Sequence, residues 1–219
     1  MTDVSPAKKA ATYLLWALPL LFPLALPGIG ALFSLAVVVI ALIFHKDARR
    51  ATLRWWGDSP GRMVAIGIGA GVVIHIGFSI LIEPLIQISL HEEIDLSNFD
   101  AVKGNLANYL ILLAIGVFFG GFAEELMFRG FVIGWGERLF GGGAIFLVVL
   151  SAAVFGAAHL YQGPSGMLST GLMGFLFGLL YLSTGRRLIA CMLAHATIDI
   201  LGITELYVGH PFLPPLFGA

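Results

Sequence analysis

Two adjacent glutamates and an arginine interrupt an apolar stretch, FGGFAEELMFRGF, at residues 119–131. Glu125 and Arg129 are four residues apart, so a helix would place them on one face, where they can form an ion pair. Glu124 is turned about 100° away and cannot share that geometry. Ionisable side chains inside a membrane span cost about 2.5–3.5 kcal/mol each on insertion scales, and they are functional by default. Glu124 therefore needs a role that its own helix does not supply.

Imidazoles and a further carboxylate occur in later apolar stretches. His195 and Asp199 are four residues apart, so the carboxylate could orient the imidazole, or both could face one cavity. His159 follows Phe155 by four residues and stands alone on its predicted helix. Water activation needs a carboxylate that removes a proton, and imidazoles that position the water and stabilise the oxyanion, directly or through a metal. Glu124, His159, His195 and Asp199 are the candidates for this chemistry.

Three other interpretations of these polar residues stay open. A buried polar network could hold the helices together, and a lone histidine such as His159 or His75 is more often a packing residue. Glutamate, histidine and aspartate on several spans also form proton relays in transporters. The sequence shows no internal inverted repeat, which counts against a transporter. A membrane scaffold without catalytic activity could use the same network for assembly.

Composition determines the environment of these residues. Of the 219 residues, 58% are hydrophobic and only 11% are charged, against about 25% charged in an ordinary soluble domain. The mean hydropathy is +0.95. This balance indicates that lipid is the main solvent. The formal net charge is −1 and no basic block occurs, so no nucleic-acid partner is expected. The single cysteine, Cys191, rules out an intrachain disulfide.

The apolar runs predict an all-α, polytopic transmembrane bundle of about seven helices with broken or kinked segments. The first run, 11–44, contains prolines at 19, 23 and 27, which remove backbone donors. We expect a hairpin there that turns near 27–30. Further spans are expected at about 63–85, 105–123 (extending as far as 137), 142–160, 166–184 and 187–208.

The distribution of charge predicts the orientation of the bundle. With a cytoplasmic N-terminus, every lysine and arginine except Lys103 falls in or near an inside segment. The acidic stretch HEEIDLSNFD, 91–100, then lies outside, as does the C-terminal tail.

Depth along the predicted spans gives one further expectation. At 1.5 Å per residue from the inner edge, Glu124 lies about 21 Å deep and His159 about 27 Å. His195 lies about 12 Å deep and Asp199 about 18 Å by the same rise. Straight helices would spread these residues over roughly 15 Å, so we expect tilt or a break near 120–121 and 156.

Three short motifs resemble those of a known family. EELMFR at 124–129, FGAAH at 155–159 and HATID at 195–199 resemble EExxxR, FxxxH and HxxxN or HxxxD. These are the ordered motifs of the CAAX prenyl protease 2-like, bacteriocin-processing (CPBP) intramembrane proteases. The resemblance covers about 105–205. It divides the chain into N-terminal transmembrane helices and loops at 1–104, a CPBP-like core at 105–208 and a short tail at 209–219, all within one integral domain.

The resemblance implies an intramembrane endopeptidase that acts on a peptide or a membrane-associated protein. It implies that Glu124 is the general base, that His159 helps to position the water, and that His195 and Asp199 stabilise the oxyanion. Glu125 and Arg129 would support the site. Asp199 stands where the prenyl proteases mostly have Asn, so it would either be protonated or orient His195.

The same resemblance leaves the cofactor and the biological setting open. A divalent metal such as zinc, if present, would be bound by Glu124, His159 and His195, while a mechanism with glutamate and histidine alone is equally compatible. We expect a prokaryotic cell membrane, where relatives serve in peptide maturation or bacteriocin immunity and prenylated substrates are not expected.

A rival motif is GPSG at 163–166, which resembles the GxSG of rhomboid-type serine proteases. Ser165 with His195 could form a nucleophile and base. That interpretation leaves Glu124, Glu125, Arg129 and His159 without a role.

Overall fold

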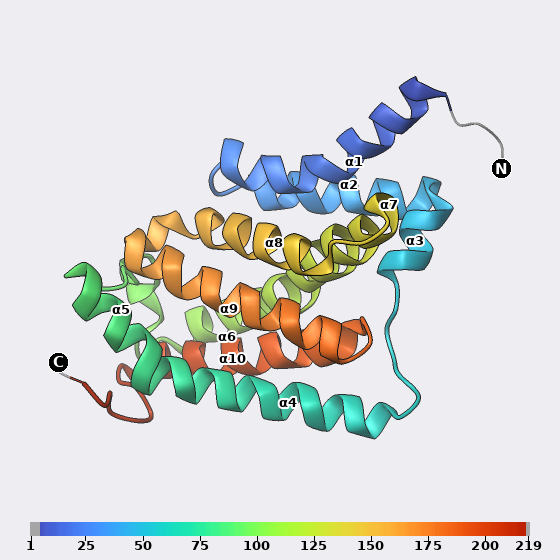
Figure 1. Ribbon diagram of the computed structural model, residues 1–219. Helices are drawn as coiled ribbons and strands as arrows, with labels where there is room; N and C mark the ends of the chain where they lie inside the picture. Colours follow the sequence, from blue (N-terminus) through green and yellow to red (C-terminus); the bar gives the residue numbers. More distant parts are fainter. Residues whose placement is uncertain (1–4, 218–219) are drawn as a thin grey trace.

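The computed structural model describes residues 5–217, and the outermost residues of the predicted N-terminal region and tail lie outside this range (Figure 1). The fold is 82% helix, and no strand occurs among the described residues. The helices are α1 (Pro6–Ala25), α2 (Gly30–Phe44), α3 (Lys46–Thr52), α4 (Pro60–Gly77), η1 (Phe78–Ile82), α5 (Glu83–Leu90), η2 (Ser97–Val102), α6 (Leu106–Ile115), η3 (Gly116–Trp135), α7 (Gly136–Phe140), α8 (Ala144–Ala158), η4 (Leu160–Gln162), α9 (Gly163–Ser183) and α10 (Leu188–Val208).

The predicted all-helical class is confirmed, but the predicted number of about seven helices is not. When segments that follow one another without a gap are counted as one helix, the described chain has nine helices. The two additional ones are short and lie in segments expected to be loops. α3 begins after His45, whose ring accepts a hydrogen bond from the Ala48 N–H, and η2 is a 3₁₀ segment of six residues. Such short capped turns carry no long apolar periodicity, so hydropathy does not predict them.

The predicted N-terminal hairpin is confirmed. α1 and α2 pack against each other and are joined at 26–29. Pro23 lies inside α1 and cannot donate to the carbonyl of Pro19. The Ser34 hydroxyl of α2 donates to that carbonyl over 3.1 Å, so the freed acceptor is satisfied across the hairpin. At Gly30, a Cβ atom would overlap the backbone of Phe22, so a glycine permits the close turn.

Four helical stretches are long and apolar enough to cross a membrane: 60–90, 106–140, 160–183 and 188–208. A fifth span results if α2 and α3, which are bent by 114°, count as one. α8 is apolar but has only 15 residues. Large apolar side chains cover the outer surface, and Phe44 is 83% exposed. This surface fits lipid, since soluble domains rarely expose large contiguous apolar patches.

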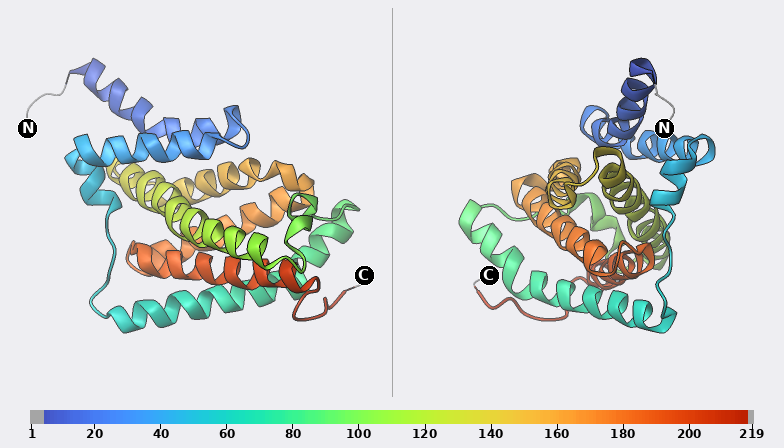
Figure 2. Two further views of the ribbon diagram at one scale, coloured as in Figure 1. Left: turned by 180° about the vertical axis from the view of Figure 1, so that it is seen from behind. Right: turned by 45° about the vertical axis from the view of Figure 1, so that its right-hand side comes forward.

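The helix that carries both glutamates crosses the middle of the bundle (Figure 2). It runs without a break through α6, η3 and α7, and residues 116–135 are wound as a π-helix. π-Helical winding uses i→i+5 hydrogen bonds, is rare, and occurs frequently at functional sites. The second half of η3 is buried by α1, α2, α3, α8 and α10.

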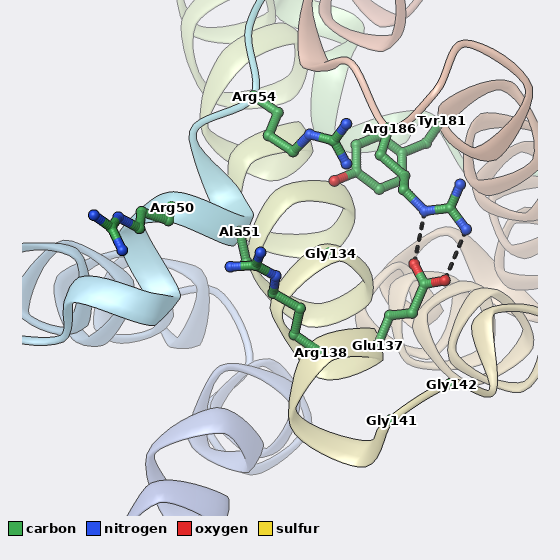
Figure 3. A pocket seen from close by; sticks show the side chains of 10 residues that line it. All are labelled: Arg50, Ala51, Arg54, Gly134, Glu137, Arg138, Gly141, Gly142, Tyr181 and Arg186. Atoms are coloured by element: carbon green, nitrogen blue, oxygen red, sulfur yellow. Dashed lines mark hydrogen bonds and ion pairs between the residues drawn. The ribbon is translucent and has the colours of Figure 1, made fainter. Parts of the chain in front are cut away.

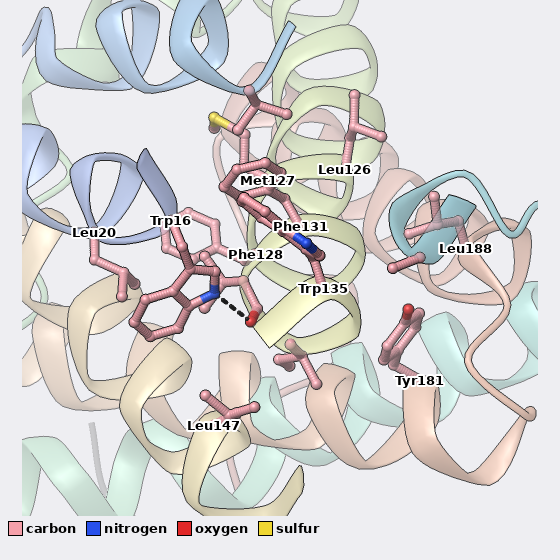
Figure 4. Close-up of a cluster of buried hydrophobic side chains, with 14 of the residues drawn as sticks. Trp16, Leu20, Leu126, Met127, Phe128, Phe131, Trp135, Leu147, Tyr181 and Leu188 are labelled. Carbon is pink, nitrogen blue, oxygen red and sulfur yellow. Dashed lines mark hydrogen bonds between the residues drawn. The ribbon is translucent and has the colours of Figure 1, made fainter. Parts of the chain in front are cut away.

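The core forms around this second half of η3 (Figure 4). Phe131 and Trp135 contact each other with tilted rings, 4.8 Å between centroids, and neither is more than 2% exposed. Trp16 of α1 donates from Nε1 to the Val132 carbonyl over 3.0 Å, and Leu147 of α8 closes the cluster. The hairpin α1–α2 is thereby fixed to the helix that carries the candidate site.

The two ends of the bundle differ in charge. Arg50, Arg54, Arg138 and Arg186 line one pocket at the end where α3, α7 and the α9–α10 turn meet (Figure 1). Segment 91–100 lies at the opposite end, where the Asp95 N–H donates to the Gln162 carbonyl. This separation agrees with the predicted charge distribution. The direction of insertion, with a cytoplasmic N-terminus, stays a prediction.

Candidate functional site

Three elements carry the candidate residues. η3 carries Glu124, Glu125 and Arg129, the end of α8 carries His159, and α10 carries His195 and Asp199. Both α8 and α10 pack directly on η3. The fold therefore brings together three helices that the sequence could only place one by one.

Glu125 lies at the centre of a buried network. The Glu125 side chain is 0% exposed, and its Oε1 atom accepts from Arg129 Nη1 over 2.9 Å and from His195 Nδ1 over 2.8 Å. Arg129 donates from Nη2 to the Gly174 carbonyl of α9 over 2.9 Å. The predicted ion pair between Glu125 and Arg129 is confirmed. It is also a junction, since it joins η3 to α9 and α10.

Aromatic rings complete the surroundings of the arginine. The Arg129 guanidinium lies 5.1 Å from the ring centroids of both Phe155 and Phe177. A cation between two aromatic faces gains electrostatic attraction where water is excluded. Phe177 also stacks on the His195 ring at 4.9 Å. The same two rings thus restrict the arginine and the imidazole.

His195 is oriented by Glu125 rather than by Asp199. A carboxylate accepts hydrogen bonds, so Nδ1 carries the hydrogen in the contact with Glu125. The other nitrogen, Nε2, faces Glu124 Oε2 at 3.9 Å and Asp199 Oδ1 at 3.8 Å. These separations exceed a hydrogen bond. Asp199 therefore does not orient the ring by direct contact, which was one of the two roles open from its spacing.

Sequence reasoning missed the contact between Glu125 and His195. The two residues are 70 positions apart, and no spacing rule connects them. No pattern in the sequence indicated this contact. Glu125 and Arg129 could already pair on one helix, so nothing in the sequence required a third partner.

Glu124, Asp199 and His195 Nε2 converge beside Gly120. A Cβ atom at Gly120 would lie 3.2 Å from His195 Nε2 and would overlap the Asp199 carboxylate. At Gly121, a Cβ atom would lie 2.9 Å from Ala196 Cβ. These glycines let α10 approach η3.

The expected break in these helices is not present. The chain stays helical through Gly120 and Gly121, with widened π winding in its place. α8 continues through Gly156, which packs against Gly171 of α9, and ends two residues later at Ala158. Of the two alternatives, tilt or a break, the break is not present at either position, and tilt stays a prediction. A small residue at a helix crossing permits close packing as readily as it permits a kink.

His159 lies at the edge of the site. It follows the last residue of α8, and its Nδ1 donates to the Phe155 carbonyl over 2.8 Å, because a carbonyl oxygen only accepts. Phe155 separates the two imidazoles, with ring centroids 4.9 Å from His159 and 6.1 Å from His195. Within residues 5–217, His159 makes no ion pair or hydrogen bond with Glu124 or Asp199.

The residues do not form a metal-binding geometry in this arrangement. In the part of the chain that the structure describes, no three His, Cys, Asp or Glu side chains are grouped so that they could hold a metal ion. The predicted ligands were Glu124, His159 and His195. Nδ1 of each histidine is hydrogen-bonded, so only Nε2 is left to bind a metal ion, and Nε2 of His195 faces the carboxylates of Glu124 and Asp199. The predicted ligand set therefore does not fit a metal ion in this arrangement.

The residues of the rival motif have structural contacts. Ser165 is fully buried, and its hydroxyl donates to the Glu92 carbonyl over 2.7 Å. This hydrogen bond joins the start of α9 to segment 91–100. A serine held in this way, with no contact to His195, lacks the geometry of an activated nucleophile.

Comparison with known proteins gives one match. The family model described as type II CAAX prenyl endopeptidase Rce1-like matches residues 106–201. This stretch is Rce1-like. It begins with α6, ends within α10, and contains all six residues of the candidate site. The family resemblance stated from the motifs is therefore confirmed over this stretch. Comparison with curated proteins gives no match, and comparison with solved structures gives none.

The Rce1-like match and the apolar helices together identify an integral membrane protein. The family also implies a peptidase with a peptide or protein substrate. The Rce1-like stretch coincides with the helices that meet at Glu124, so family and geometry point to the same part of the chain.

Proposed function

We propose that this protein is an intramembrane endopeptidase that hydrolyses a peptide bond in or near the membrane. The observation that carries the proposal is the position of Glu124. Its carboxylate, 21% exposed, lies 3.9 Å from His195 Nε2 inside the Rce1-like stretch. Glu125, the adjacent glutamate, is fully buried and engaged by Arg129. The chain thus contains one structural and one available carboxylate side by side.

The geometry suits activation of a water molecule. A water placed about 2.8 Å from both Glu124 Oε2 and His195 Nε2 would bridge their separation of 3.9 Å. Glu124 would take a proton from this water as its oxygen attacks the substrate carbonyl carbon. The same proton would pass from Glu124 to the leaving amine when the peptide bond breaks. Atoms and charge then balance without a further group.

The two groups on α10 would stabilise the tetrahedral intermediate. Doubly protonated His195 would donate from Nε2 to the developing oxyanion, while Glu125 holds Nδ1. Asp199, on the other side of Nε2 at 3.8 Å, would donate a second hydrogen bond in its protonated form. His159 would act at the edge of the site, where its Nε2 faces away from the bond to Phe155. Its role is to position the water or the peptide.

The description of the matched family suggests a class of substrate. The matched family is described as one of CAAX prenyl endopeptidases, so a membrane-anchored peptide is the substrate to test first. We expect a prokaryotic membrane, in which unprenylated peptides are the alternative. A divalent metal such as zinc is tested separately.

Proteolysis in liposomes tests the proposal. Purified wild-type protein is incubated with a peptide library, half of it prenylated, and cleavage is read by mass spectrometry. Glu124→Gln should reduce cleavage at least about 10³-fold, since it removes the general base. Glu83→Gln serves as the matched control, because Glu83 lies on another span and accepts from Ser169 outside the site. Equal activity of Glu124→Gln and wild type would refute the assignment, and chelation of the wild type decides the need for a metal.

A proton-coupled transporter is the second candidate, and one observation favours it. His75 of α4 lies 3.4 Å from Glu205 of α10, six residues beyond Asp199. Polar groups therefore continue along α10 away from the candidate site, as in a proton relay. Proton flux into vesicles that is lost in Glu205→Gln, together with the absence of any cleavage, would support the transporter. Absence of both activities would support a non-catalytic scaffold.

A further inference from the structure

A cavity of about 640 Å³ opens at the arginine-rich end of the bundle. Figure 3 shows its walls, which come from α3, α7, the end of α9 and the turn that follows α9. Four arginines line it, Arg50, Arg54, Arg138 and Arg186, with Glu137 as the one carboxylate. The four guanidinium groups and the one carboxylate give the pocket a formal charge of +3. Its lining on the helix that carries Glu124 begins at Gly134, ten residues beyond Glu124, and includes no residue of the candidate active site.

Only one of the four arginines is neutralised. Arg186 donates from Nε and Nη2 to the two carboxylate oxygens of Glu137, over 2.8 and 2.7 Å (Figure 3). These hydrogen bonds raise the pKa of Arg186. Among residues 5–217, no carboxylate pairs with Arg50, Arg54 or Arg138. Three arginines therefore line the pocket without a paired carboxylate, and their guanidinium groups are available to an anion.

A buried hydroxyl at the wall of the pocket also lacks a partner. Tyr181 is 0% exposed, and its Oη atom makes no hydrogen bond within the described chain. Figure 3 shows the hydroxyl on the side of the pocket where Arg54 lies. A Cβ atom at Gly134 would lie 2.5 Å from Oη, so a glycine leaves the room that the hydroxyl occupies. Buried polar groups nearly always have a partner, so an unpaired donor here points to an acceptor supplied by a ligand.

The chemistry that fits is a phosphate. Its oxygens are acceptors only, and guanidinium groups bind them through paired, charge-assisted hydrogen bonds. We propose that this pocket binds the phosphate of an anionic lipid headgroup. The proposal does not depend on the proposed peptidase activity.

The surroundings favour a lipid over free phosphate. Phe140, two residues after Arg138, is 51% exposed, and Phe44, two residues before α3, is 83% exposed. Such side chains lie in the hydrocarbon or at its edge, so the arginines beside them are at headgroup level. Basic pockets between transmembrane helices are recurrent sites for anionic headgroups. A headgroup in this pocket would link α3 to α7 and to the α9–α10 turn.

Thermal unfolding of the full-length protein in neutral detergent tests the site. Short-chain phosphatidylglycerol is added, and short-chain phosphatidylcholine and inorganic phosphate serve as comparison probes. Phosphatidylglycerol should raise the unfolding midpoint in a saturable manner, at concentrations at which the other two probes have little effect. An equal effect of inorganic phosphate would overturn the lipid assignment and leave a phosphate site. If neither phosphatidylglycerol nor inorganic phosphate raises the unfolding midpoint, the proposal is overturned.

Variants of the pocket give the second test. The double variant Arg54→Gln, Arg138→Gln should weaken the apparent affinity for phosphatidylglycerol at least about tenfold. Arg62→Gln is the matched control, because Arg62 is an exposed arginine on α4 that does not line the pocket. Tyr181→Phe should weaken binding about threefold to tenfold without lowering the midpoint of the lipid-free protein. Equal weakening in the control, or full affinity in the double variant, would refute the proposal.

Discussion

Glu124 and Glu125 are neighbours in the chain, but we predict opposite consequences for their replacement by glutamine. Glu125→Gln should destabilise the fold strongly, whereas Glu124→Gln should leave stability within about 1 kcal/mol of wild type and abolish hydrolysis. The difference follows from position. Glu125 is fully buried and accepts from both Arg129 and His195, while Glu124 is 21% exposed and accepts from no described residue.

The expected magnitude for Glu125→Gln is about 3–5 kcal/mol, the cost of removing one partner from a buried ion pair. The glutamine oxygen can still accept from Arg129, so the loss comes mainly from the missing charge. Arg129 is itself 0% exposed and would keep no anionic partner, only the glutamine oxygen, the Gly174 carbonyl and two aromatic faces. Removing both charges, as in Glu125→Leu with Arg129→Met, should cost about 2–3 kcal/mol less than the sum of the single changes.

Unfolding by a denaturing detergent in mixed micelles measures these differences. The four tryptophans provide the fluorescence signal, and Trp135 lies buried on the same helix. Cleavage of a peptide is recorded on the same preparations. If both glutamine variants lose the same stability, or if the Glu125 and Arg129 changes are additive, the division into a structural and an available carboxylate is wrong.

Three further outcomes are expected. Gly120→Ala places a methyl group against the polar atoms of α10 and should lower cleavage about 10²-fold, whereas Gly69→Ala, which meets no atom within 4 Å, should not. Ser165→Ala should cost about 1 kcal/mol through the lost bond to Glu92 and retain cleavage, which a serine protease would lose. Cys191 is 0% exposed, so maleimide should label it only after unfolding, and rapid labelling of the native protein would contradict its burial.

Apolar patterning predicted the fold to the extent that long helices depend on it. The hairpin at 6–44 and the helices at 60–90, 106–140 and 188–208 agree with the expected spans within a few residues. What the pattern missed is short or local. α3 begins after a cap at His45, and η3 is wound as a π-helix over residues 116–135. Neither leaves a periodic signature in the sequence.

The sequence singles out candidate residues for a site, but it does not contain their geometry. An ionisable residue in a membrane span is costly wherever it lies, so composition alone singled out Glu124, His195 and Asp199. Pairing on one helix follows from spacing, and Glu125 with Arg129 obeys it. Pairing between helices depends on rotation and depth, which spacing does not contain. The contact between Glu125 and His195, and the lack of a hydrogen bond between His159 and Glu124 in the described chain, are of this second kind.

The adjacency of the two glutamates has a geometric cause. Consecutive residues on a helix point in different directions, so Glu125 is fully buried while Glu124 is 21% exposed and faces His195 Nε2 of α10. Arg129 and His195 both donate to the buried Glu125 carboxylate, and these hydrogen bonds offset the cost of burying its charge. This arrangement fixes the imidazole with Nε2 directed toward the second carboxylate. Separating the glutamates by even one residue would rotate Glu124 away from His195. We therefore expect that inserting an alanine between positions 124 and 125 abolishes cleavage even where the Glu125–Arg129 pair is retained.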